Sequence, residues 1–80
     1  MKAIVHIALK PGVLDPQGQA ITGALHSMGF DEVTDAQQGK VIELDLQGVD
    51  RVAAQERVEA MCSKLLANTV IEQFSVEIVD

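Results

Sequence analysis

The stretch KLLANTVIE (residues 64–72) switches from one kind of secondary structure to another within two residues. Its first four residues favour a helix, whereas Val70 and Ile71 are β-branched and favour a strand. Only Asn68 and Thr69 lie between them, and asparagine tolerates the left-handed conformation that ends many helices. We therefore expect a tight connection, with a helix that stops at Asn68 and a strand that begins at once.

The residues before this junction have the periodicity of an amphipathic helix over roughly residues 51–67. Asp50 can cap its first turn by accepting a backbone hydrogen bond. The apolar positions expected to face the core are Ala54, Val58, Met61, Cys62 and Leu65. After the junction apolar residues alternate along a strand, and its core face is expected to carry Phe74, Val76 and Ile78.

The stretch KAIVHIALK (residues 2–10) alternates with a period of two, which predicts a strand whose core face carries Ala3, Val5, Ile7 and Leu9. A Pro-Gly pair then signals a turn. Asp15 followed by Pro16 marks a helix start, because aspartate caps well and proline suits the first helical position. Gly29 is expected to end this helix, and its apolar stripe is Ile21, Ala24, Leu25 and Met28.

The segment DEVTDAQQGKVIELDLQG (residues 31–48) has the pattern of a β-hairpin. A short strand is expected over residues 32–36, followed by a turn at residues 37–39. A longer strand comes next, with one apolar face made of Ile42, Leu44 and Leu46.

The predicted order is therefore β-α-β-β-α-β within a single domain, residues 1–80. This order is typical of an α+β, ferredoxin-like two-layer sandwich, in which both helices cover one face of a four-stranded antiparallel sheet. The outer face of that sheet is more apolar than a solvated face would be. We expect an oligomer interface there that includes Ile4, His6, Val41, Ile71 and Val79.

Composition limits the possible partners. The chain has 80 residues, a net charge of −6 and only two phenylalanines as aromatic residues, so we expect no nucleic-acid partner. A chain this short buries only about 60% of its unfolded surface. Its one cysteine cannot form an internal disulfide, so oligomerisation is the expected source of further stability.

The location of the protein is predicted from its apolar runs. None approaches the roughly 20 residues that a membrane-spanning helix needs, and the N-terminal stretch lacks the apolar centre of a signal peptide. We expect a cytoplasmic chain that makes no contact with a membrane.

Catalytic and metal-binding motifs are absent from the sequence. We therefore expect no catalytic residue and no metal ligand in this chain. Cys62 falls on the core stripe of its helix and is predicted to be a buried structural thiol. His6 and His26 have no carboxylate or thiol partner in the sequence. Glu43 and Asp45 share one strand face about 7 Å apart, a spacing more often found on a solvated or interface surface.

The segment KPGVLDPQG (residues 10–18) is the most distinctive polar stretch. A helix N-terminus attracts anions, but Asp15 would repel one there. We interpret the segment as a structural turn that contacts a partner. The residues that we take as partner-contact candidates are Lys10, Asp15, Gln17, Lys40 and Asn68.

Four stretches together resemble the PurS family over nearly the whole chain: LKPGVLDPQGQAI (9–21), ALHSMGF (24–30), GKVIELDL (39–46) and CSKLLANTVIE (62–72). The spacing between them also fits. One departure lies at Ala36-Gln37, where the family usually carries Val-Arg. A charged contact from this segment is therefore expected to be absent or replaced.

The resemblance implies a small subunit of phosphoribosylformylglycinamidine synthase, also called formylglycinamide ribonucleotide amidotransferase, in de novo purine biosynthesis. In that ligase complex a glutaminase subunit releases ammonia, and a synthase subunit uses ATP and Mg to incorporate it. A PurS-like chain is expected to bind no cofactor itself. It is expected to form a homodimer or tetramer, to bridge the glutaminase and synthase subunits without an active site of its own, and to help ammonia transfer.

An alternative is a small-molecule-binding regulatory domain of the ACT type, which shares the β-α-β-β-α-β order. Such domains bind amino acids at dimer interfaces near a glycine-bearing loop after the first strand, and Pro11-Gly12 could be that loop. A ferredoxin-like metal carrier is disfavoured because the chain lacks a CxxC motif.

Overall fold

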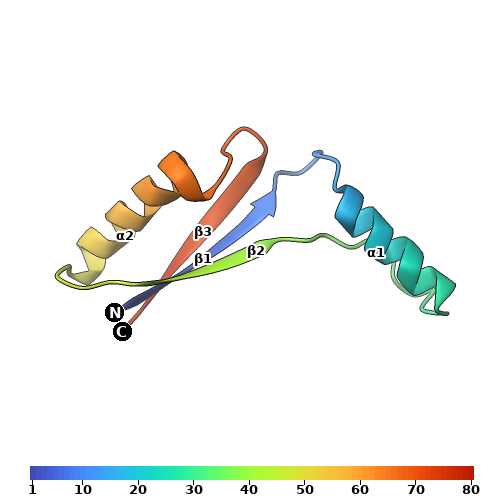
Figure 1. Ribbon diagram of the computed structural model, residues 1–80, viewed down its shortest axis with the longest axis horizontal. Helices are drawn as coiled ribbons and strands as arrows, with labels where there is room; N and C mark the ends of the chain where they lie inside the picture. Colours follow the sequence, from blue (N-terminus) through green and yellow to red (C-terminus); the bar gives the residue numbers. More distant parts are fainter.

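The computed structural model describes residues 1–80 and contains three strands and two helices, the second of which continues into a π-helical turn. In chain order the elements are β1 (Lys2–Leu9), α1 (Pro16–Ser27), β2 (Lys40–Asp45), α2 (Arg51–Met61), the π turn η1 (Cys62–Leu66) and β3 (Glu72–Val79). The order is β-α-β-α-β, and the fold is of the α+β class (Figure 1). Neither helix has the length and apolar character that a membrane crossing requires.

The sheet has three antiparallel strands in the order β2-β1-β3, with β1 at its centre. The register places Ile4 between Glu43 on one side and Glu77 on the other. Because side chains alternate along a strand, Val5 and Ile7 lie on one face of β1, and Ile4 and His6 lie on the other. The sheet therefore has one apolar inner face and one mixed outer face, and β2 and β3 each have a free edge.

The core lies between the inner face of the sheet and α2. Asp50 begins α2 as predicted, since its carboxylate accepts a hydrogen bond from the Ala53 N–H at 2.7 Å. The helix packs mainly against β3. The buried side chains that form the core cluster are Ala3, Val5, Ile7, Ala54, Val58, Cys62, Ala67 and Ile78. The predicted core faces of the first and last strands are thus confirmed, with Leu9, Phe74 and Val76 only half-buried.

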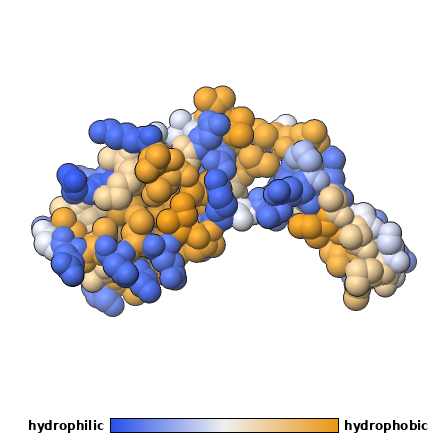
Figure 2. Space-filling view, in the orientation of Figure 1, coloured by the Kyte–Doolittle hydropathy of each residue, from blue (hydrophilic) through white to orange (hydrophobic).

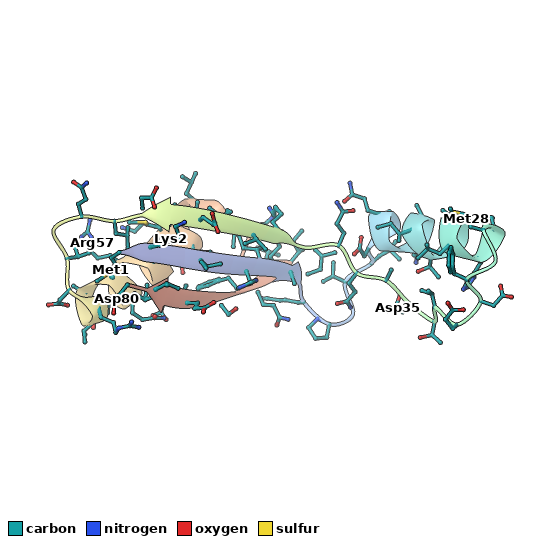
Figure 3. All side chains as sticks on the ribbon, turned by 90° about the horizontal axis from the view of Figure 1, so that it is seen from below. Met1, Lys2, Met28, Asp35, Arg57 and Asp80 are labelled. Carbon is teal, nitrogen blue, oxygen red and sulfur yellow. The ribbon has the colours of Figure 1, made fainter.

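The first helix lies apart from the sheet. α1 continues beyond the end of β1, and the chain returns beside it to begin β2 (Figure 1). We call residues 10–39 the arm, and the sheet together with α2 the body. Met28 lies at the end of the molecule opposite to Met1 and Asp80 (Figure 3). The radius of gyration is consequently 16.1 Å, against about 12 Å for a compact domain of this length.

The prediction of a four-stranded sheet with both helices on one face was wrong. Residues 32–36 form no strand, because they run beside α1, where no other strand lies within reach to pair with them. Residues 37–39 lead directly into β2 and do not form a hairpin turn. The arm holds the helix and the extended segment that a complete sandwich would place on the body.

The predicted core stripe of the second helix is correct up to the π turn. Val58 and Cys62 are fully buried, but Leu65 is 82% exposed. A π turn contains more residues than an α turn, so it rotates the side chains that follow. Leu66 therefore turns inward in place of Leu65.

The junction between η1 and β3 is tight but does not use a left-handed residue. Ala67 is extended and ends the helix, and no residue other than glycine has a positive φ. The Asn68 side chain accepts a hydrogen bond from the Val70 N–H at 3.2 Å. Residues 69–71 form a turn, and the strand begins at Glu72. Asparagine acts here through its side chain and not through its backbone conformation.

Candidate functional site at the base of the arm

Two connectors join the arm to the body beside the turn that precedes β3. Residues 10–15 leave β1, and residues 37–39 enter β2. The Lys10 N–H donates to the Ile71 carbonyl oxygen at 2.8 Å, which holds the first connector against this turn. The five predicted partner-contact residues lie here, and the structure adds Glu72 to them. We call these six residues the arm-base cluster: Lys10, Asp15, Gln17, Lys40, Asn68 and Glu72.

Asp15 joins both connectors through its carboxylate. One oxygen caps α1 by accepting from the Gly18 N–H, and the other accepts from the Gln38 N–H, each at 2.9 Å. These hydrogen bonds, chiefly that from Gln38, hold the pKa of the Asp15 carboxyl below its ordinary value. The carboxylate also fills the N-terminus of α1 and would repel an anion there. Asp15 therefore stabilises the base of the arm, whether or not it touches a partner.

Gly18 was missed by sequence reasoning, although it is the one buried residue of α1. The returning chain passes so close that a Cβ atom at Gly18 would collide with the Ala36 carbonyl oxygen. At the other end of α1, His26 Nε2 donates to the Val33 carbonyl oxygen at 2.6 Å. The arm is thus one unit, because its helix is held to the returning segment at both ends.

Glu72 was also missed, although its position carries a signal. It shares its strand face with Phe74, so a carboxylate stands on a side of β3 that is otherwise apolar. Its Oε1 accepts from the Asn68 N–H at 2.7 Å, and its Oε2 lies 3.4 Å from Lys40 Nζ. The Asn68 N–H, and after it Lys40, lower the pKa of the Glu72 carboxyl.

A cavity of about 280 Å³ lies at the arm base, with Gln17, Lys40 and Glu72 among its lining residues. Lys10 Nζ donates to the Thr69 carbonyl oxygen at 2.7 Å. Both lysines are exposed, and each ammonium has three N–H donors. The cluster can therefore present ammonium and amide donors beside the carboxylates of Asp15 and Glu72, which suits polar contacts with another chain.

Four of the predicted outer-face residues, Ile4, His6, Val41 and Val79, lie on the outer face of the sheet, but they do not form one continuous apolar patch. Ile4 is half-buried between two glutamates, whereas Val41 is 61% exposed and lies beside His6. Ile71 belongs to the turn before β3. This face combines apolar and charged groups, as the rim of an interface does.

Cys62 is fully buried, as predicted. Burial, and after it the charge of Glu59, raises the pKa of the Cys62 thiol. A thiol that stays protonated is a poor nucleophile. Nowhere in the structure do three His, Cys, Asp or Glu side chains lie together in a way that could hold a metal ion.

The low pKa of Asp15 makes a prediction about acid stability. A carboxyl group whose pKa is lower in the folded chain stabilises it above the unfolded pKa, near 3.8, and the effect disappears as the pH falls through the folded pKa. Asp15→Asn removes the charge and leaves one acceptor oxygen in place of the two that accept from the Gly18 and Gln38 N–H groups. We expect the free energies of unfolding of the two proteins to differ near neutral pH and to converge below pH 3.8.

Urea unfolding at several pH values measures this difference. Asp35→Asn is the matched control, because Asp35 is an exposed arm carboxylate that accepts no side-chain hydrogen bond. Its unfolding free energy should follow that of the wild-type chain throughout. A gap between wild type and Asp15→Asn that persists unchanged into acid would show that the charge of Asp15 is not what stabilises the arm base.

The structure defines a small α+β domain of β-α-β-α-β order, with a three-stranded antiparallel sheet and a projecting arm. Residues 2–80 match the PurS family, described as phosphoribosylformylglycinamidine (FGAM) synthase. The chain therefore belongs to the PurS family of FGAM synthase subunits, which act in purine biosynthesis.

Individual relatives agree with this assignment. The chain is 49% identical over 77 residues to the PurS subunit of Bacillus subtilis, a match that covers 96% of this chain and 90% of the relative. The solved structure of B. subtilis PurS resembles it with a TM-score of 0.89 at 48% identity, covering 99% of this chain and 98% of that one. A chain of the PurLQS structure from Thermotoga maritima resembles it with a TM-score of 0.88 at 28% identity, covering 98% and 95%.

Proposed function

We propose that this chain is a non-catalytic assembly subunit that bridges the glutaminase and ATP-dependent synthase subunits of FGAM synthase and helps ammonia pass between them. The observation that carries the proposal is the arm. It projects away from the body (Figure 1), and its Leu14 and Met28 are 66% and 70% exposed. Figure 2 shows apolar surface on the arm as well as on the body. Large apolar side chains left exposed on a projecting segment suit contact with another chain.

The related chain from T. maritima supports the proposal, because it comes from a PurLQS structure and has the same fold. The corresponding L and Q chains are the partners that we propose for this protein. A bridge of this kind raises the effective concentration of ammonia at the synthase, because it fixes the distance between the site of release and the site of use. ATP, Mg²⁺ and glutamine would then be bound by the other subunits.

The chain's own chemistry is consistent with a positional role. Its single thiol is buried and has a raised pKa. The carboxylates with lowered pKa values, Asp15 and Glu72, accept hydrogen bonds from neighbouring backbone and are engaged in holding the arm base. We propose that the arm-base cluster contributes polar contacts and the arm apolar contacts to the assembly.

We also propose that the chain works as a homodimer or tetramer in the cytoplasm. The outer face of the sheet stays the predicted second contact surface, through Ile4, His6, Val41, Ile71 and Val79. Because its aliphatic side chains alternate with glutamates, this face suits a smaller and more polar contact than the arm does.

Reconstitution from the separate subunits tests the bridging role. We expect the three chains to co-elute as one complex in the presence of glutamine and nucleotide. Glutamine-dependent formation of the amidine should fall to near background when this chain is left out, and adding it back should restore the rate. If the other two subunits assemble and work fully without it, the bridging role is wrong, and amino-acid binding to the isolated chain becomes the function to test.

A matched pair of variants in the same assay tests the arm-base cluster. Lys40→Ala removes an ammonium group of the cluster, and Lys64→Ala removes one from an exposed position of η1. We expect the first variant to bind its partner subunits several-fold more weakly and the second to bind them normally.

A further inference from the structure

We propose that the free edge of β3 binds an extended segment of a different subunit of the complex, in which an aliphatic side chain stands next to a lysine or an arginine. The inference rests on the bridging role proposed above and deepens it, because it names a contact surface and the chemistry that fits this surface. The contact uses the body of the chain and does not involve the arm.

The hydrogen bonds next to β3 show which of its backbone groups face the free edge. The N–H of Lys10, the residue that follows β1, donates to the Ile71 carbonyl oxygen at 2.8 Å, so the backbone of residue 71 faces β1. Peptide groups alternate in direction along a strand, and residues 73, 75, 77 and 79 therefore also face β1. The residues whose backbone faces the free edge are Glu72, Phe74, Val76 and Ile78.

The chain itself closes both ends of this edge. At one end the Glu72 N–H donates to the Asn68 carbonyl oxygen at 2.7 Å. At the other end Arg51 Nη1 donates to the Ile78 carbonyl oxygen at 3.0 Å. These two contacts use the groups that a longer added strand would need.

Phe74 and Val76 remain open between the closed ends, and we call these two residues the edge window. No other strand lies beside β3 on this side. Each of the two residues offers one N–H donor and one C=O acceptor, so an added strand can form about four hydrogen bonds with about three residues of its own. An open edge is a template for an extended chain. The window therefore suits a short segment.

A groove of about 540 Å³ lies between α2 and this edge, and Val52, Gln55 and Val76 are among the residues that line it. Val52 is 72% exposed, so its own chain leaves it uncovered. Side chains that lie opposite each other on paired strands share one face of the sheet. The residue opposite Val76 would therefore place its side chain in the groove beside α2. An aliphatic side chain fits there, because it would cover Val52.

Acidic groups surround the groove. Glu56 of α2 and Glu77 of β3 both line it and are exposed, whereas the cation beside them, Arg51, already pairs with Asp80 at 2.9 Å. A residue next to the aliphatic one would point to the outer face, where Glu77 lies. A lysine or arginine is favoured at this position. A second copy of this chain, with its net charge of −6, would instead bring acidic groups against acidic groups, so a different chain is the occupant.

Hydrogen exchange in the assembled complex tests the edge window. The ¹⁵N-labelled chain is exposed to D₂O alone or in the complex with its two partner subunits, and its amides are read by NMR after quenching and dissociation. We expect the Phe74 and Val76 N–H groups to exchange at least about tenfold more slowly in the complex. The Ser75 and Glu77 N–H groups face β1 and are the internal control, since they are protected in both states.

A matched pair of charge reversals tests the chemistry of the occupant. Glu77 and Glu43 are both exposed, and Ile4 lies between them in the register of the sheet. Only Glu77 belongs to β3. We expect Glu77→Lys to weaken binding to the partner subunits at least about tenfold, and Glu43→Lys to change it by less than about threefold. Equal losses from the two variants would assign the effect to the outer face and not to the edge of β3.

Three results would overturn the inference: edge-window amides that exchange equally fast in the complex and in the free chain, a Glu77→Lys variant that binds normally, or protection of these amides in the isolated chain that grows with its concentration. The last result would identify a second copy as the occupant. A complex that forms and is active without protection of the edge window contradicts this inference alone. If no complex forms, the bridging role is wrong, and the inference fails with it.

Discussion

Replacing Gly18 with alanine is expected to lower the free energy of unfolding by about 2 kcal/mol. The added methyl group would collide with the backbone carbonyl oxygen of Ala36 and lie 2.9 Å from the Asp15 carboxylate. A backbone carbonyl cannot move aside as a flexible side chain can. The returning segment must therefore separate from α1, which weakens the hydrogen bonds that Asp15 accepts at the arm base. Thermal and urea unfolding measure the loss.

Gly23→Ala is the matched control in the same helix. Apart from the backbone of its own helix and its chain neighbours, no atom lies within 4 Å of a Cβ placed there, so the substitution should stabilise the chain by up to about 1 kcal/mol through helix propensity alone. The two substitutions are thus expected to change the free energy of unfolding in opposite directions. If Gly18→Ala stabilised the chain as much as Gly23→Ala does, the close approach between α1 and residue 36 would be absent in solution.

Val58→Ala is expected to cost about 2 kcal/mol, which for a domain of this size lowers the Tm by roughly 8–16 °C. Val58 is fully buried between α2 and the sheet. Truncating it removes two methyl groups from contact and leaves a cavity that the small neighbours Ala54 and Cys62 cannot fill. The free energy of unfolding in urea measures the loss.

Val52→Ala makes the same chemical change on the same helix. Val52 is 72% exposed, so its substitution should change the unfolding free energy by less than about 0.5 kcal/mol. Helix propensity changes equally in both variants, and their difference therefore isolates the packing of Val58. Equal losses from the two substitutions would contradict the placement of the core between α2 and the sheet.

Local features of the fold could be predicted from the sequence because they depend on neighbouring residues. Asp15 and Asp50 cap their helices, Gly29 has a positive φ just after α1, and the alternation from Ala3 to Ile7 fixes the buried face of β1. Each of these signals acts over a few residues. The π turn could not be foreseen, since nothing in the spacing of Leu65 and Leu66 distinguishes it from a continuing α-helix.

The prediction of a four-stranded sheet was wrong for a different reason. An apolar stripe shows that Ile21 and Met28 need burial, but it does not show which surface buries them. Likewise the pattern of residues 32–36 favours a strand without naming its neighbour. A pattern of this kind shows that a surface favours burial or pairing, but it does not identify the surface that provides it.

The residues of the candidate site also divide into those that could be predicted from the sequence and those that could not. Lys10, Asp15, Gln17, Lys40 and Asn68 were predicted as partner-contact candidates, and the structure brings these five residues together at the arm base. Gly18 and Glu72 were missed because their roles depend on a segment far along the chain. For Gly18 that segment contains Ala36, and for Glu72 it contains Lys40.

The central position of β1 in the sheet also has a consequence for the order of folding. Its register pairs Lys2 with Val79, so the body closes only when the two ends of an almost complete sequence meet. The arm, in contrast, closes through the hydrogen bond from Gln38 to Asp15, across 23 residues. Short loops cost less entropy to close than long ones and form sooner. We therefore expect the arm to form while the body is still open, and the pairing of β1 with β3 to be the later step.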